Sequence, residues 1–198
     1  MFHNEKVIGV DYGSKYAGTT VVAMFDNNKV VFKQSKVKAN ADTFLIELIK
    51  IFLPDKVFID APLSLPGVYF QPDNYSDYFY RQSDREAGAM SPMFLGGLTA
   101  RAMQLKDQLS DANISFKETY PGGFANELKL KEMGYKRNTS HCNDIMCFLE
   151  DFSGFNVEKN IDLTWHHVDA LLTLVSAKRY FSGEHTVLGN PEEGQIIF

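Results

Sequence analysis

The chain has 198 residues, of which 44% are hydrophobic and 23% are charged, a composition that is typical of a globular protein and excludes a disordered one. A formal net charge of -5 argues against strong, nonspecific nucleic-acid binding, which needs clustered lysine and arginine, although a small basic patch is not excluded. The sequence has neither an apolar run long enough to span a bilayer nor a signal-peptide pattern. We therefore expect a single cytoplasmic domain over residues 1–198, without membrane contact.

A β-hairpin is predicted near the N-terminus. Residues 7–10 are apolar and rich in β-branched side chains, a polar turn between two glycines follows, and a second apolar run comes after it. The first strand ends at Asp11, a carboxylate that is costly in a buried position unless a positive group meets it. After a turn at residues 26–28, the alternating pattern of residues 29–37 predicts a third, antiparallel strand.

A helix and a parallel strand come next. Apolar residues recur at helical spacing over residues 44–52, and Pro54 ends this amphipathic helix. Residues 56–60 then form a short buried strand, which also ends at a carboxylate, Asp60. Because a crossover through a helix normally makes the new strand parallel to the one it joins, we expect a parallel pairing for this strand.

Residues 64–91 differ in character and are rich in proline and aromatic residues. A long irregular excursion in a compact domain is usually a functional loop or a lid. Arg81 and Arg85 are candidates for binding a phosphate, beside tyrosines that can stack on bases. The alternative is that these arginines pair within the loop, with Asp84 or Glu86.

The second half of the chain predicts mainly helices. The last one starts near Asp162 or Thr164, ends at Gly183, and carries Asp169 within its apolar stripe. The other expected elements are a helix over residues 93–109, a strand over 114–120, helices over 124–133 and 141–152, and a short terminal strand within residues 189–198.

Four carboxylates occupy comparable places in these elements. Asp11, Asp60 and Glu118 lie on strands, and Asp169 lies on the last helix. They can converge if the strands are neighbours, and carboxylates that lie close together repel unless a divalent cation compensates them. Magnesium or manganese is the natural partner because both take oxygen ligands, and two such ions support hydrolysis of a phosphodiester.

The strand acids also have structural explanations. Asp11 precedes a glycine turn and could form an Asx turn, and Asp60 precedes Ala-Pro and could cap a loop. Glu118, flanked by lysine and threonine, could face solvent.

Asp169 is harder to explain without a function, because unpaired acids are rarely buried. Arg101 or Lys15 could pair with it, and Lys15 is also a candidate for contacting a substrate. His166 shares the helical face of Asp169 at i, i+3 spacing, which makes it a candidate base or substrate contact. The alternative for His166 is a packed or exposed histidine.

The order of the elements, with the segments VIGVDYGSKYAGTTVV, FIDAPLSLP, RQSDRE, ETYPGG, HHVDALLTLVSAKRY and GNPEEGQIIF, resembles the RNase H-like superfamily. In particular it is similar to a family of predicted nucleases catalogued as a domain of unknown function, over most of the chain. The resemblance implies an α/β fold with a mixed five-stranded sheet in the order 3-2-1-4-5, strand 2 antiparallel, and helices on both faces. It also implies that Asp11 is the central metal ligand and that Asp60, Glu118 and Asp169 support it.

The predicted function is that of a metal-dependent nuclease, which holds Mg²⁺ or Mn²⁺ and hydrolyses phosphodiester bonds in DNA or RNA. A homodimer is left open. One alternative is a nucleotide-binding module of the actin and sugar-kinase type, in which the N-terminal hairpin cradles phosphate. Such proteins generally need two subdomains, and this chain has room for one. Another alternative is a scaffold with a decayed site, whose aromatic loop binds a protein partner.

Overall fold

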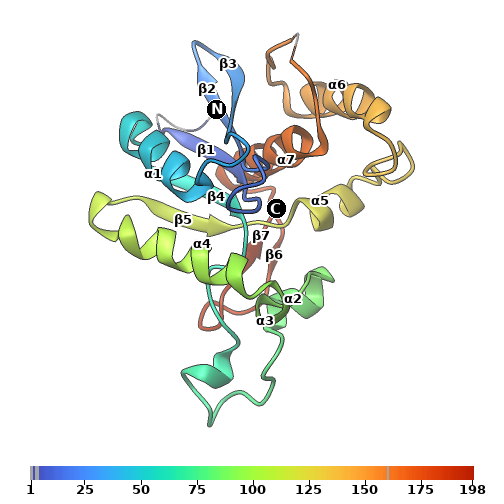
Figure 1. The fold of residues 1–198 in the computed structure, drawn as a ribbon. Helices are drawn as coiled ribbons and strands as arrows, with labels where there is room; N and C mark the ends of the chain where they lie inside the picture. The colour runs from blue at the N-terminus through green and yellow to red at the C-terminus, as the bar shows by residue number, and fades with distance from the viewer. Residues whose placement is uncertain (1, 3–4, 160) are drawn as a thin grey trace.

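The chain folds around one mixed β-sheet that carries helices on both faces (Figure 1). A computed structural model describes residues 2, 5–159 and 161–198. The strands are β1 (Val7–Asp11), β2 (Val21–Asp26), β3 (Lys29–Gln34), β4 (Lys56–Asp60), β5 (Ser115–Glu118), β6 (Val187–Leu188) and β7 (Ile196–Ile197). Their order in the sheet is β3-β2-β1-β4-β5-β7-β6.

The strand pairing extends the predicted sheet. β1 pairs antiparallel with β2 and parallel with β4, and β4 pairs parallel with β5. The sheet has seven strands rather than the predicted five, because β7 joins β5 in parallel and β6 returns antiparallel to β7. The C-terminal segment therefore completes the edge beyond β5.

The helices are α1 (Ala41–Phe52), α2 (Gln82–Ala87), α3 (Pro92–Leu95), α4 (Gly97–Gln108), α5 (Pro121–Glu127), α6 (Cys142–Ser153) and α7 (Trp165–Ser182). Two of them depart from the predicted ranges. The helix expected over residues 93–109 is interrupted at Gly96, whose φ of 48° suits glycine and breaks the helical path. The helix expected over residues 124–133 begins at Pro121, where the fixed φ of proline favours a first helical position.

Each face of the sheet has its own apolar core. On one face, α1 and α4 contribute Leu45, Ile49, Ala102 and Leu105, which pack with alternate residues of β1 and β4. On the other face lie α5, α6 and α7, with Phe58 of β4 among the buried residues. Since side chains alternate along a strand, the face of each polar strand residue follows from these neighbours.

α7 is the central helix of the fold. Its residues from His167 to Ala177 are all buried, because it lies against β1, β2 and β4 on one side and α5 and α6 on the other. It approaches β1 closely at Gly9, where an added Cβ would lie 2.5 Å from the backbone nitrogen of Leu174 and 2.8 Å from the carbonyl oxygen of Ala170. A glycine at this position therefore sets the distance between β1 and α7.

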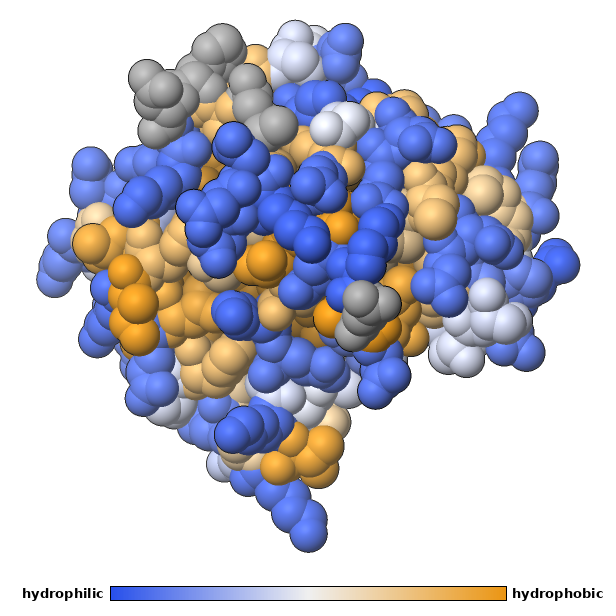
Figure 2. All heavy atoms as spheres, turned by 90° about the horizontal axis from the view of Figure 1, so that it is seen from above, coloured by the Kyte–Doolittle hydropathy of each residue, from blue (hydrophilic) through white to orange (hydrophobic). Residues whose placement is uncertain are grey.

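The segment 64–91 leaves the sheet after β4 and returns to it through α2, as the lower part of Figure 1 shows. It is more ordered than predicted, since it contains a short 3-10 helix (Gly67–Tyr69) as well as α2. Viewed from above, the surface is largely hydrophilic with apolar patches between the charged side chains (Figure 2). Of the helices in the described ranges, none has the length and apolar character that crossing a lipid bilayer requires.

Candidate active site

Asp11 and Asp60 end neighbouring parallel strands at the same level. They are directly opposed residues in the pairing of β1 with β4. Asp11 is two residues after Gly9, which touches α7, and Asp60 is two residues after Phe58, which belongs to the core beneath α7. Both carboxylates therefore project from the α7 face of the sheet.

Asp169 extends this pair from the helix. It lies in the first half of α7 and is buried, and its carboxylate accepts hydrogen bonds from two groups. The Tyr135 hydroxyl lies 2.5 Å from Oδ1, and the Lys136 ammonium lies 2.8 Å from Oδ2. Lys136 keeps its side chain 52% exposed, so Asp169 pairs with a cation that is in contact with solvent.

His166 connects the start of α7 to β1. Its Nδ1 lies 2.7 Å from Oδ2 of Asp11. The hydrogen bond with this carboxylate raises the pKa of His166. Its neighbour His167 is different, because its Nδ1 accepts a hydrogen bond from the backbone amide of Thr164 and so caps the helix. Of the two histidines, only His166 belongs to the carboxylate cluster.

The acids of this cluster are held in an unfavourable environment. Burial raises the pKa of Asp11 to about 6, and the negative charge of Asp169 adds to the rise while the hydrogen bond with His166 opposes it. Burial is the main reason why the pKa of Asp60 is well above its usual range. The negative charges of Asp11 and Asp169 raise this pKa further. Asp60 has no hydrogen-bond or ion-pair partner in the part of the chain that the structure describes. It is the least compensated acid of the three.

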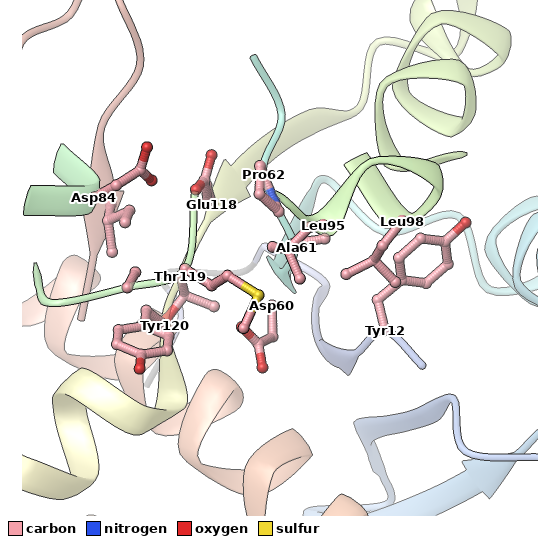
Figure 3. A pocket seen from close by; sticks show the side chains of 13 residues that line it. Tyr12, Asp60, Ala61, Pro62, Asp84, Leu95, Leu98, Glu118, Thr119 and Tyr120 are labelled. Atoms are coloured by element: carbon pink, nitrogen blue, oxygen red, sulfur yellow. The ribbon is translucent and has the colours of Figure 1, made fainter. Parts of the chain in front are cut away.

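Glu118 lies apart from the other three acids. It opposes Ile59 rather than Asp60 in the pairing of β5 with β4, so it projects from the opposite face of the sheet. In Figure 3 the Asp60 carboxylate and the Tyr120 hydroxyl point to one side, whereas the carboxylates of Glu118 and Asp84 point to the other. The predicted convergence of four carboxylates is thereby reduced to three.

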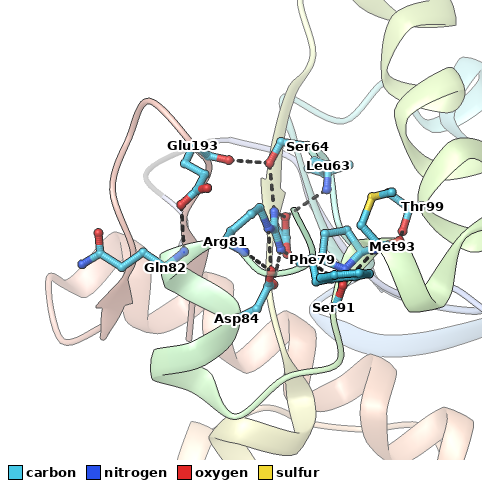
Figure 4. A network of polar contacts seen from close by, with 12 residues as sticks. Leu63, Ser64, Phe79, Arg81, Gln82, Asp84, Ser91, Met93, Thr99 and Glu193 are labelled. Atoms are coloured by element: carbon cyan, nitrogen blue, oxygen red, sulfur yellow. Dashed lines mark hydrogen bonds and ion pairs between the residues drawn. The ribbon is translucent and has the colours of Figure 1, made fainter. Parts of the chain in front are cut away.

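The partner of Glu118 is Arg81, which is 0% exposed. Figure 4 shows Arg81 at the centre of a polar network with Asp84 and Ser64. Two guanidinium nitrogens donate to Glu118 at 2.5 and 2.7 Å, and the same group donates to Asp84 at 2.6 and 3.1 Å. The alternative of an ion pair between Arg81 and Asp84 is therefore present. Glu118 is buried and does not face solvent, and the guanidinium of Arg81 is not available to a substrate.

The remaining predicted cations have other partners. Arg85 is exposed and pairs with Asp77, also within the loop, rather than with Asp84 or Glu86. Arg101 pairs with Asp42 at 2.6 Å, and Lys15 lies 3.9 Å from the same carboxylate. Neither of these two is the partner of Asp169. Lys15 and Arg85 remain accessible to a ligand, whereas Arg101 holds α4 to the start of α1.

Two backbone amides of the hairpin turn already donate hydrogen bonds within the protein, so they are not available to a phosphate. The amide of Gly13 donates to the Thr20 hydroxyl, and the amide of Ser14 donates to the Thr19 hydroxyl, both at 3.1 Å. These are the groups that a phosphate cradle would use. Their engagement with threonine hydroxyls gives no support to the actin-like alternative.

Three residues of the cluster were not anticipated from the sequence. Tyr135 and Lys136 lie in the turn before α6, and Tyr120 follows β5. Burial raises the pKa of Tyr120, and the charge of Asp60 adds to this effect. The sequence feature that predicts a cation here is Asp169 itself, because a buried acid needs a positive partner. This feature does not identify Lys136 as that partner.

The donor set suits a hard cation, because three carboxylates influence one another electrostatically and Asp60 has no partner among the described residues. Among the described residues, however, no three His, Cys, Asp or Glu side chains are already arranged as a group that could hold a metal ion. The contacts of Asp11 with His166 and of Asp169 with Lys136 occupy oxygen atoms that a cation would need. Lys136 supplies here the positive charge that a cation would otherwise bring.

Replacing Lys136 with methionine is expected to lower the free energy of unfolding in EDTA by about 1–3 kcal/mol, between the values for exposed and buried ion pairs. Without the ammonium of Lys136, no positive side chain among the described residues competes with a metal ion for the carboxylate of Asp169. Added Mn²⁺ should therefore raise the melting temperature of the variant more than that of the wild type. Differential scanning fluorimetry with EDTA or Mn²⁺ measures both effects. Lys131→Met, at an exposed lysine nearby, is the matched control and should change neither.

No model of a known protein family matches this chain, and no curated protein matches it. The resemblance to the RNase H-like superfamily therefore depends on the quoted motifs and on the order of the elements.

Proposed function

We propose that the protein is a metal-dependent nuclease of RNase H-like type that uses Asp11, Asp60 and Asp169 as its metal ligands. The observation that carries this proposal is the half-buried carboxylate of Asp60, which has no partner among the residues that the structure describes and is directly opposed to Asp11 across two parallel strands. Evolution of a stable fold alone would not favour three acids at one place, because their mutual repulsion disfavours the folded state. A bound divalent cation explains the cluster.

The side chains divide into three roles under this proposal. Asp11, Asp60 and Asp169 hold Mg²⁺ or Mn²⁺, which when bound activates a water molecule and neutralises the leaving oxygen. His166 orients the Asp11 carboxylate through Nδ1, and its Nε2 is on a partly exposed ring from which it can exchange a proton with the substrate. Lys136 is placed to bind a phosphate once the cation takes over its charge on Asp169.

Cleavage assays with Mg²⁺ or Mn²⁺ test the proposal. The wild type, Asp11→Asn and Asp169→Asn are each incubated with labelled DNA and RNA substrates. These substrates are single strands, duplexes and junctions. We expect metal-dependent cleavage by the wild type and a loss of roughly 100- to 1,000-fold in each variant, as for removal of a charge-stabilising group from an active site. Isosteric amides preserve the size of both side chains, so the variants should remain folded.

Asp26→Asn is the matched control. Asp26 also ends a strand, β2, but it is exposed and pairs with Lys29 in the ladder instead of meeting the cluster. Its variant should cleave like the wild type. Equal cleavage by wild type, Asp11→Asn and Asp169→Asn would exclude the assigned site, and absence of cleavage from every substrate would exclude the activity.

A further inference from the structure

A cavity of about 290 Å³ lies beside Asp60, and we call it the Asp60 cavity (Figure 3). It lies at the carboxyl ends of β4 and β5 and is lined by residues at and after these ends and by the start of α4. Its volume is at the lower end of the range for small-molecule sites. Residues that give it apolar and aromatic walls include Ala61, Met90, Leu95, Leu98 and Tyr120.

Two polar side chains of the lining have no hydrogen-bond partner within residues 2, 5–159 and 161–198. One is Asp60, described above, and the other is Thr119, which follows Glu118 in the chain. The Thr119 hydroxyl is buried and makes no hydrogen bond within the described residues. Buried hydroxyls are normally paired, because leaving one without a partner is costly. A ligand with a polar edge would satisfy it.

An exposed aromatic side chain adjoins the lining residue Leu95 in the chain. Met90 lines the cavity and is itself 59% exposed, so it lies at the opening. Phe94, next to Leu95 of the lining, is 61% exposed and stacks on Phe79 with a centroid distance of 5.6 Å. A pair of exposed, adjoining aromatic rings offers an apolar surface on which a planar group can stack.

A cation adjoins this aromatic surface. The Arg85 guanidinium lies 4.5 Å from the centroid of the Tyr80 ring, and Tyr80 contacts Phe94 edge-on at 5.9 Å. Arg85 is exposed, although Asp77 pairs with it. Aromatic rings for the bases combined with positive charge for the backbone are the usual means of binding single-stranded nucleic acid.

We propose that the Asp60 cavity binds the base of one unpaired nucleotide, and that Phe79 and Phe94 stack on a neighbouring base. This inference rests on the proposed nuclease function, because a base in the cavity places its own phosphate beside Asp60. The substrate is then single-stranded nucleic acid, or an unpaired nucleotide in a longer molecule, and a continuous duplex is excluded.

The chemistry of the cavity favours a base over the other parts of a nucleotide. The faces of a base are apolar and suit walls of leucine, methionine and tyrosine, while its polar edge can reach the Thr119 hydroxyl. A sugar would lose its hydration without gaining enough hydrogen bonds from these walls. A base pair is too large for a cavity of this volume.

The test measures binding separately from cleavage. Fluorescence anisotropy in EDTA compares labelled single strands of DNA and RNA with a hairpin duplex of the same length and with unlabelled mononucleotides as competitors, all at one salt concentration. We expect single strands to bind at least about tenfold more tightly than the duplex. Ala89→Trp, which fills the cavity, and Phe94→Ala, which removes the stack, should each weaken binding of single strands by about tenfold.

Ala100→Trp and Ile51→Ala are the matched controls, at exposed positions outside the cavity, and should bind like the wild type. Melting curves measure whether Ala89→Trp is folded. If Ala89→Trp is unfolded, the binding measured for Phe94→Ala still tests the inference. Equal affinity for single strand and duplex, or no effect of either variant, overturns the inference.

Cleavage with Mn²⁺ then separates this inference from the nuclease assignment. Cleavage of duplex by wild type and Ala89→Trp alike would exclude the base cavity while supporting the nuclease. Binding of single strands that Ala89→Trp abolishes, without cleavage of any substrate, would support the cavity and exclude the nuclease. Competition by mononucleotides as strong as that by the strands would show that one base suffices and would exclude the role of Phe79 and Phe94.

Discussion

Replacing Arg81 with methionine is expected to lower the free energy of unfolding by about 3–5 kcal/mol. At this chain length the loss corresponds to a fall in melting temperature of roughly 6–20 °C. Arg81 is fully buried and is the only cation that contacts both Asp84 and Glu118 in the described part of the chain. Methionine would fill much of the volume but would leave two buried carboxylates without a counter-charge.

The network around Arg81 joins three distant segments. Besides its two acids, Arg81 donates to the Ser64 hydroxyl at 2.9 Å. Ser64 donates in turn to the carbonyl oxygen of Glu193, whose carboxylate accepts from the amide of Gly67 at 2.7 Å. The loop after β4, β5 and the C-terminal segment are thus fixed together, so the loss of Arg81 should also loosen the loop that forms one wall of the Asp60 cavity.

Arg85→Met provides the matched control for this prediction. Arg85 lies on α2, which begins directly after Arg81, and also pairs with an acid, but it is exposed, and exposed pairs contribute about 0–1 kcal/mol. Urea denaturation of both variants measures the difference. A loss of less than about 1 kcal/mol in Arg81→Met, or equal losses in the two variants, would contradict the role assigned to the buried network.

Much of the sheet could be predicted from local sequence patterns. The first five strands show as apolar or alternating segments in the sequence. Their order, 3-2-1-4-5, is implied by the resemblance to the RNase H-like superfamily, and the sheet has this order. β6 was missed because two residues, Val187 and Leu188, are too short to show alternation, and its pairing depends on β7. The break at Gly96 was missed because apolar residues continue on both sides of it.

The site shows what sequence can and cannot decide. Asp11, Asp60 and Asp169 could be selected because an acid at the end of a buried strand or within an apolar helix is costly. Glu118 satisfied the same criterion, but the register between β4 and β5 decides its face, and a shift of one residue reverses it. Segments separated by more than fifty residues in the chain carry no local signal of their register. Lys136 lies in a turn, where a lysine is usually only solvated.

Replacing Asp60 with asparagine is expected to change stability and activity in opposite directions. In EDTA at about pH 7, the variant should melt at a higher temperature than the wild type, because it removes a charge that is partly buried beside Asp11 and Asp169. With Mn²⁺ the wild type should gain stability and the variant should not, since it lacks one ligand. Its cleavage of nucleic acid should fall by roughly 100- to 1,000-fold.

The pH dependence of the stability difference identifies its cause. The pKa of Asp60 is raised in the folded state, so folding is disfavoured by its ionisation above the pKa of the unfolded chain. The advantage of Asp60→Asn should therefore be present at neutral pH, decrease as the pH falls through the raised pKa, and vanish below about pH 4, where the carboxyl is protonated in both states. Melting curves across this range, with Asp26→Asn as the control, make the comparison. A variant that is less stable than the wild type at neutral pH without metal would show that Asp60 has a favourable partner, and the reason for placing a cation beside it would be lost.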